Sequence, residues 1–108
     1  MAERLDQKQL AKAIAANRFE WRLHALVRMA QRGILQQDVL RVACEGERIE
    51  DYPEGKPYPA ALFLGTTNNR PLHVVAAHDS TNDHAYVITA YFPDELHFEP
   101  DWRTRREL

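Results

Sequence analysis

Three basic side chains recur at four-residue intervals between Phe19 and Ile34, in the segment FEWRLHALVRMAQRGI. On a helix, residues spaced i, i+4 and i+8 form one ridge, so His24, Arg28 and Arg32 are expected to lie together. An imidazole can exchange a proton near neutral pH, and guanidinium groups suit phosphate recognition. The ridge is therefore either a candidate site for an anionic substrate or the solvated edge of an ordinary amphipathic helix.

A second group of polar residues lies on two predicted strands, 72–78 (LHVVAAH) and 84–92 (HAYVITAYF). Successive side chains of a strand point to opposite faces, so Thr89 and Tyr91 share a face. If His73 lies on that same face, all three residues can approach the helix ridge. His73 could equally be a core histidine bonded to a backbone carbonyl, because its neighbours are apolar.

This combination suits metal-free RNA cleavage, in which a base takes the ribose 2′-OH proton, arginines neutralise the phosphate and a Tyr or His serves the leaving oxygen. The candidate catalytic residues are His24, Arg28, His73 and Tyr91. The candidate RNA-binding residues are Arg32, Thr89, Arg103, Arg105 and Arg106. The last three belong to the C-terminal stretch WRTRREL, which could instead be a solvated end of the chain.

Other catalytic or metal-binding patterns find little support in the sequence. The histidines and acids His73, His78, Asp79, Asp83 and His84 could be considered as zinc ligands, but the chain has no HExxH helix and no cysteine pair. A Gly-rich phosphate loop and a serine nucleophile elbow are also missing from the sequence. We therefore expect neither a metal site nor a cofactor.

Composition and charge describe an ordinary globular domain with an uneven charge distribution. The 108 residues are 44% hydrophobic and 28% charged, with no apolar run of transmembrane length and no signal peptide, so we expect a cytoplasmic protein that does not bind membranes. Residues 1–48 carry nine Lys or Arg against six acids, whereas residues 49–100 carry two against eight. Such asymmetry is compatible with a cationic surface for phosphates on one side.

The pattern of elements predicts an α+β domain. Three helices are expected. The first covers 3–17, the central one begins after a bend at 17–20 and ends at Gly33, and the third covers 35–45 and is followed by Gly46. A short strand in 47–53 and strands over 60–66, 72–78 and 84–92 have short connections, which favour antiparallel pairing. The prediction is a single domain, 1–108, with an accessory helix in 1–18 and a core over 19–106, in which helices pack on one face of a three- to four-stranded antiparallel sheet. The apolar stripe expected to face the core consists of Leu23, Leu26, Val27, Ala30 and Ile34.

Several motifs in order resemble the bacterial domain of unknown function 4258. They are HALVRMAQRGI (24–34), DVLRVACEGERIEDYP (38–53), RPLHVV (70–75) and ITAYFPD (88–94), with WRTRR near the end. The resemblance implies a RelE/ParE-type, RelE-like toxin fold and an mRNA-cleaving toxin of a type II toxin–antitoxin pair, with an antitoxin protein as partner. The family's recurring polar positions fall on His24, Arg28, Arg32, His73, Thr89 and Tyr91.

Two functional hypotheses follow. The first is a metal-independent endoribonuclease toxin that acts on RNA, free or associated with the ribosome. The second is a non-catalytic protein-interaction module in which the histidines are structural. The sequence leaves open the oligomeric state, the RNA sequence preference and which histidine would act as base.

Overall fold

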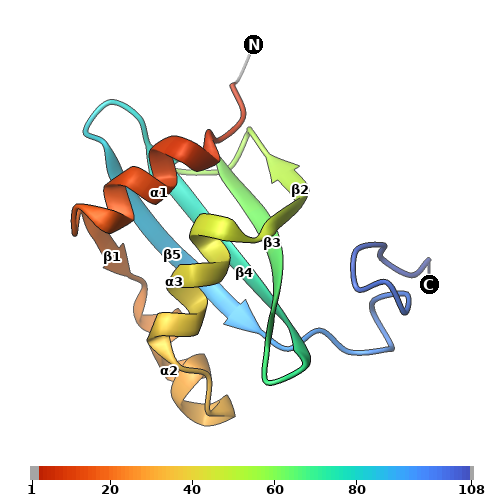
Figure 1. The fold of residues 1–108 in the computed structure, drawn as a ribbon. Helices are drawn as coiled ribbons and strands as arrows, with labels where there is room; N and C mark the ends of the chain where they lie inside the picture. The colour runs from red at the N-terminus through yellow and green to blue at the C-terminus, as the bar shows by residue number, and fades with distance from the viewer. Residues whose placement is uncertain (1–2, 108) are drawn as a thin grey trace.

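The computed structural model describes residues 3–107, which form three helices and five strands. The helices cover one face of a single sheet, and the chain continues beyond the last strand as an irregular C-terminal segment (Figure 1). This arrangement confirms the α+β class. In chain order the elements are α1 (Gln7–Ala15), β1 (Phe19–Trp21), α2 (Leu23–Arg32), α3 (Gln36–Glu45), β2 (Glu47–Tyr52), β3 (Ala60–Thr67), β4 (Arg70–Asp79) and β5 (His84–Tyr91).

The sheet is mixed and has the strand order β1-β5-β4-β3-β2. Strands β2 to β5 pair antiparallel, as their short connections predict, whereas β1 runs parallel to β5. The prediction of a purely antiparallel sheet of three to four strands is therefore wrong. The additional strand, Phe19–Trp21, arises at the predicted bend before the central helix. Parallel pairing is possible there because most of the domain lies between β1 and β5 in the chain, which gives the backbone room to return.

Helix α2 buries a different face from the one predicted. Leu23 is 76% exposed and Val27 is 47% exposed, whereas Ala25 and Met29 are buried. The reason is that α2 starts directly after β1, and Arg22 between them donates its backbone N–H to a carbonyl of β5. Strand pairing therefore fixes the rotation of α2 about its axis, and part of its apolar surface is left facing solvent.

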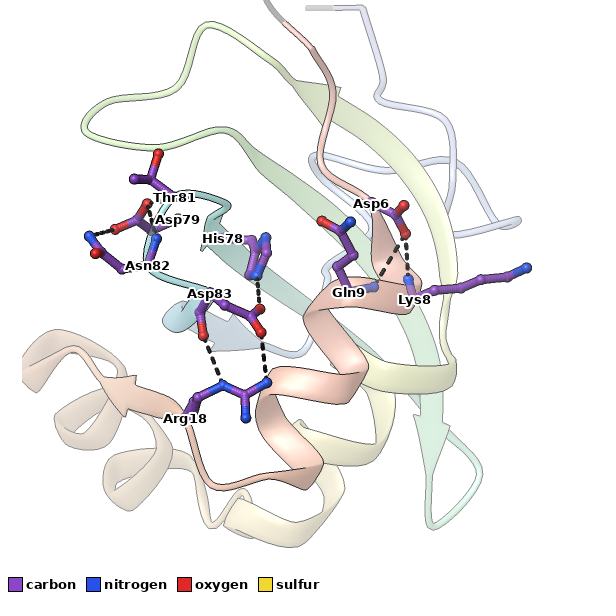
Figure 2. Close-up of polar contacts among 9 residues, drawn as sticks. All are labelled: Asp6, Lys8, Gln9, Arg18, His78, Asp79, Thr81, Asn82 and Asp83. Atoms are coloured by element: carbon purple, nitrogen blue, oxygen red, sulfur yellow. Dashed lines mark hydrogen bonds and ion pairs between the residues drawn. The ribbon is translucent and has the colours of Figure 1, made fainter.

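The helix ends follow local sequence rules. Asp6 accepts hydrogen bonds from the backbone N–H groups of Lys8 and Gln9 and so caps the start of α1 (Figure 2). Gly33 ends α2 with a left-handed φ of 69°, as predicted, and Gly46 follows α3. Within residues 3–107, no helix combines the length and apolar character that crossing a bilayer requires.

The helices pack on one face of the sheet, and the C-terminal segment packs on the other. Val74 and Val87 point to the helices and belong to the main core. His73 and Tyr91 are register partners and point to the opposite face. There the ring of Phe98, from the C-terminal segment, is 2% exposed and lies 4.6 Å from the ring of His73. His73 therefore does lie on the same face as Tyr91, which the sequence left open, but this face meets α2 only at the edge of the sheet.

Candidate functional site

A pocket of about 580 Å³ opens where α2 meets the C-terminal end of β5. Arg28 and Arg32 reach it from successive turns of α2, as their four-residue spacing predicts. Arg70 is the first residue of β4, and Tyr91 is the last residue of β5. The other lining residues are Gln31, Phe92, Pro93 and Asp94. The helix ridge and the end of the sheet thus share one open pocket.

The pocket gathers guanidinium groups that have no carboxylate partner. Among residues 3–107, no ion pair involves Arg28, Arg32 or Arg70, whereas seven other arginines each pair with a carboxylate. The guanidinium carbon of Arg70 lies 3.6 Å from the centre of the Phe92 ring, which orients this side chain. The acid that lines the pocket, Asp94, accepts hydrogen bonds within its own turn. The arrangement favours an anionic ligand.

Tyr91 connects the pocket to a buried imidazole. Its hydroxyl oxygen lies 3.2 Å from Nδ1 of His73, whose Nε2 lies 2.7 Å from the carbonyl oxygen of Trp102. A carbonyl oxygen can only accept, so Nε2 carries a hydrogen. Burial lowers the pKa of His73 below its ordinary value of 6.5, although the hydrogen bond to Trp102 opposes this effect. The imidazole is therefore neutral near pH 7, and its Nδ1 lone pair faces the Tyr91 hydroxyl.

The Tyr91 hydroxyl keeps its proton and can donate it to His73. Burial raises the pKa of Tyr91, while the nearby guanidinium groups of Arg105 and Arg28 act in the opposite direction. A phenol with a raised pKa is protonated at neutral pH, so its O–H donates to Nδ1 while its oxygen retains lone pairs. Tyr91 is thus the group through which His73 can exchange a proton with the pocket.

A cluster of polar side chains on the same face holds the C-terminal segment in place. Arg105 donates two hydrogen bonds to the carboxylate of Glu50, at 2.7 and 3.1 Å, and Tyr52 donates to the same carboxylate. Burial alone would raise the pKa of Glu50, but the bonds from Arg105 and Tyr52 lower it overall. Burial, together with the bond to Glu50, raises the pKa of Tyr52 to about 12. Glu50 is therefore an ionised anchor for the segment that covers His73.

A second pocket extends the first one along this segment. It has a volume of about 200 Å³ and shares with the first pocket Arg28, Tyr91, Pro93 and Asp94. It adds His97, Phe98 and Arg105 to the lining. Because the two pockets have these walls in common, we describe them together as the groove, with Tyr91 and Arg28 at its middle.

Two of the predicted site residues lie outside the groove. The His24 side chain is exposed on the first turn of α2 and lines neither pocket. Thr89 shares the sheet face of Tyr91 and pairs with Val75, but it also lines neither pocket, and its buried hydroxyl oxygen has no hydrogen-bond partner. The structure therefore brings together Arg28, Arg32 and Tyr91, with His73 directly behind Tyr91.

The three C-terminal arginines pair with carboxylates of the protein itself. Arg103 bonds Glu47, Arg105 bonds Glu50, and Arg106 bonds Glu99. Glu47 and Glu50 belong to β2, so Arg103 and Arg105 fasten the C-terminal segment to the sheet. Arg105 in addition lines the second pocket. RNA contact by these arginines remains a prediction, and it would compete with the ion pairs.

Sequence reasoning missed two residues of the groove. Arg70 stands alone at the start of its strand, and nothing in its neighbourhood marks it; only the hairpin brings it beside Tyr91. His97 lies in the C-terminal segment, and its spacing from a nearby acid could have marked it in the sequence. Asp94 lies three residues before it and bonds Nδ1 of His97 at 2.7 Å, a short-range pairing that follows the end of β5.

Of the histidines and acids considered as zinc ligands, His78 and Asp83 bond each other near the β4–β5 loop. His78 Nε2 lies 2.9 Å from a carboxylate oxygen of Asp83, whose other oxygen accepts from Arg18 at 2.7 Å (Figure 2). Asp79 accepts from the backbone of Thr81 and from Asn82, which closes the loop. Within residues 3–107, no three His, Cys, Asp or Glu side chains are grouped as metal binding requires. This cluster ties the loop to the chain entering β1.

Comparison with known proteins gives a family. No curated protein and no solved structure matches the chain. One family model, described as a domain of unknown function (DUF4258), matches residues 21–92. This range includes α2 with its arginine ridge, the hairpins and Tyr91, but it ends before the C-terminal segment that covers His73. Since the match spans well over half of the sequence, the chain belongs to the DUF4258 family.

Proposed function

We propose that the protein is a metal-independent endoribonuclease that holds a phosphodiester in the groove. As the resemblance to RelE/ParE-type toxins implies, we further propose that it serves as the toxin of a type II toxin–antitoxin pair in the cytoplasm. The observation that carries the proposal is the meeting of Arg28, Arg32 and Arg70 with Tyr91, which is backed by a neutral His73. Among residues 3–107, none of these three arginines has a carboxylate partner.

The arginines bind and neutralise the phosphate. Guanidinium groups donate several hydrogen bonds in a fixed plane and suit the non-bridging oxygens of a phosphodiester. In the transition state of RNA cleavage these oxygens gain negative charge, so fixed cations beside them lower the barrier. Arg28 and Arg32 supply this charge from one wall of the pocket and Arg70 from another element, which would hold the phosphate on more than one side.

The proton of the ribose 2′-OH would leave through Tyr91. The Tyr91 oxygen accepts it while the Tyr91 proton passes to Nδ1 of His73, so the phenol is protonated before and after the step. The 2′-oxygen attacks phosphorus, the bond from phosphorus to the 5′-oxygen breaks, and a 2′,3′-cyclic phosphate forms. His73 becomes a cation whose Nε2–H remains bonded to the Trp102 carbonyl. His73 acts only through Tyr91, because it is fully buried.

The leaving 5′-oxygen requires a proton, and we assign the supply of this proton to His97. Its imidazole is exposed, lines the second pocket and bonds Asp94 through Nδ1. A carboxylate in this position orients the ring. The proton leaves Nε2 for the 5′-oxygen, and solvent afterwards returns His97 and His73 to their starting states. We assign no step to His24, because it lies outside the groove.

Cleavage in the presence of EDTA tests this proposal. Purified protein is incubated with RNA, with and without ribosomes, and with DNA of the same sequence. We expect RNA fragments ending in a 2′,3′-cyclic phosphate, intact DNA because it lacks the 2′-OH, and loss of cleavage in Tyr91→Phe. Absence of cleavage with and without ribosomes, together with normal growth on induced expression, would overturn the proposal.

The alternative, a non-catalytic interaction module, also has an observation in its favour. His73 is fully buried and both of its ring nitrogens are occupied, as expected of a structural histidine. In that case Tyr91→Phe would lower stability slightly and leave RNA intact in every sample. The same cleavage experiment therefore distinguishes the two functions.

A further inference from the structure

Helix α2 carries an apolar stripe that faces away from the core. Leu23 and Val27 are 76% and 47% exposed, and Ala30 is exposed as well. Among residues 3–107 only four large hydrophobic side chains are exposed; two of them belong to this stripe and a third, Leu35, lies at the connection to α3. Single exposed apolar residues are common on proteins, but several gathered on one helix indicate a contact surface.

The spacing of the stripe suits one partner helix. Leu23, Val27 and Ala30 follow one another at intervals of four and three residues, which is the spacing of the contact positions in a two-helix coiled coil. The small side chain of Ala30 would let the partner backbone approach closely. A strand or an irregular loop would not match this periodicity.

The charges beside the stripe specify the chemistry of the partner. The segment from Trp21 to Gln37 contains no acidic residue. At about 100° per residue, His24 lies about 60° and Arg28 about 100° around the helix from Val27, and Arg32 lies further round, away from the stripe. Within the described residues, neither Arg28 nor Arg32 is in an ion pair with a carboxylate. A partner helix with acidic residues beside its apolar face would complement this positively charged helix.

We propose that the stripe Leu23–Val27–Ala30 is the docking surface for an amphipathic helix of another protein, with Asp or Glu flanking its apolar face. A second copy of this chain fits less well. A two-fold contact would set α2 against α2 and bring two positively charged helices together with no acid between them, which costs free energy. The proposal does not rest on RNA cleavage, because none of the three stripe residues lines the groove.

A displayed library of helix-forming peptides, randomised on one face, tests the proposal with the full-length protein as target. We expect the selected peptides to carry apolar residues at heptad spacing bordered by Asp and Glu. Their affinity, measured by fluorescence anisotropy, should fall by roughly tenfold or more for Leu23→Ser/Val27→Ser and should weaken with salt. Leu96→Ser is the matched control, because Leu96 is 74% exposed and lies in the C-terminal segment, outside α2.

The outcomes are decisive in either direction. Binding that is lost in Leu23→Ser/Val27→Ser and kept in Leu96→Ser supports the proposal. Selection of basic peptides, or of peptides that bind the double variant as well as the original protein, would overturn it. It would also be overturned if sedimentation equilibrium gave a dimer that the double variant abolishes. Thermal unfolding of both variants checks that exposed substitutions leave the fold intact.

Discussion

The hydroxyl of Tyr91 lies 3.2 Å from Nδ1 of His73, and the opposite nitrogen of the same ring lies 2.7 Å from the carbonyl of Trp102. A path of hydrogen bonds therefore runs from Tyr91 of β5 through the imidazole of His73 to Trp102 of the C-terminal segment. The two bonds together fix the tautomer of the imidazole. A neutral acceptor behind a protonated phenol is an arrangement that can move a proton without exposing the histidine. This relationship leads to the first prediction.

Replacing Tyr91 by Phe should abolish the proton path while keeping the ring in place. If the proposed mechanism holds, we expect kcat for RNA cleavage to fall by roughly 10²-fold or more, with little change in KM, because the arginines that hold the phosphate remain. Steady-state cleavage assays with a fluorescent RNA measure both constants. A change confined to KM would contradict the role given to Tyr91. His24→Gln is the control, and it should cleave at the normal rate.

Replacing Arg28 or Arg70 by Gln should weaken RNA binding. Each substitution removes a guanidinium that is in no ion pair within the described part of the chain, so the expected loss of affinity is roughly five- to tenfold at moderate salt. The slope of log affinity against log salt concentration should fall by about 0.7 for each phosphate of a single-stranded RNA that the variant no longer neutralises. The matched control is Arg41→Gln, because Arg41 already pairs with Asp38 at 3.3 Å. Equally weakened binding in all three variants would indicate nonspecific charge attraction.

Disrupting the anchor of the C-terminal segment should cost stability. Arg105→Ala removes a two-point hydrogen bond to Glu50, but the Arg105 side chain is 53% exposed, so solvent screens the pair. We expect a loss of about 1 kcal/mol in the free energy of unfolding. Urea denaturation measures it, and a double-mutant cycle with Glu50→Gln isolates the pair. A coupling energy near zero would mean that packing of Phe98, and not this ion pair, holds the segment.

Close packing of α3 on β3 gives a prediction for Gly65. A Cβ at this position would lie 2.5 Å from Cγ2 of Val42, and the valine is itself buried in the core. Gly65→Ala should therefore destabilise the domain by about 1–3 kcal/mol through overpacking. Thr66→Ala, at the exposed neighbouring position, should change stability much less. Equal thermal midpoints of the two variants would show that Val42 can move aside at little cost.

The sequence predicted elements that are stabilised locally and missed those that depend on distant partners. The β3–β4 and β4–β5 hairpins consist of apolar segments joined by short polar connections, so their strands could be located from the sequence. The three residues of β1 have no such local support, because they form a strand only by pairing with β5, more than sixty residues later. The predicted core stripe of α2 failed for the same reason, since this pairing sets the rotation of the helix.

The candidate site was predictable to a similar degree. Arg28 and Arg32 follow from helix periodicity, and the shared face of Thr89 and Tyr91 follows from strand parity, whereas the register of β4 against β5 was needed to place His73 on that face. The partners of the C-terminal arginines could not be found in this way, because Arg103 and the acid it bonds are 56 residues apart in the chain. The sequence also did not show which face of the sheet the C-terminal segment covers. This face decides whether His73 is exposed.

The buried state of His73 should make stability depend on pH in the range where free histidines titrate. The folded protein lowers the pKa of His73 below its ordinary value of 6.5 because burial disfavours the charged ring. At pH values between 6.5 and the pKa of His73 in the folded protein, the unfolded chain therefore binds more protons at this residue than the folded protein does. Stability is then greatest above pH 6.5 and falls as the pH drops through 6.5 towards the folded value.

Urea denaturation from pH 7.5 down to pH 5 measures this dependence in the original protein and in His73→Gln. The glutamine amide can donate to the Trp102 carbonyl and accept from Tyr91, but it does not titrate. We therefore expect the variant to be less stable at pH 7.5 and to lose less stability on acidification. His24→Gln, at an exposed position, should keep the original slope. A slope unchanged by His73→Gln would mean that the pKa of His73 is the same in the folded and the unfolded protein, which would contradict the lowering of this pKa by burial.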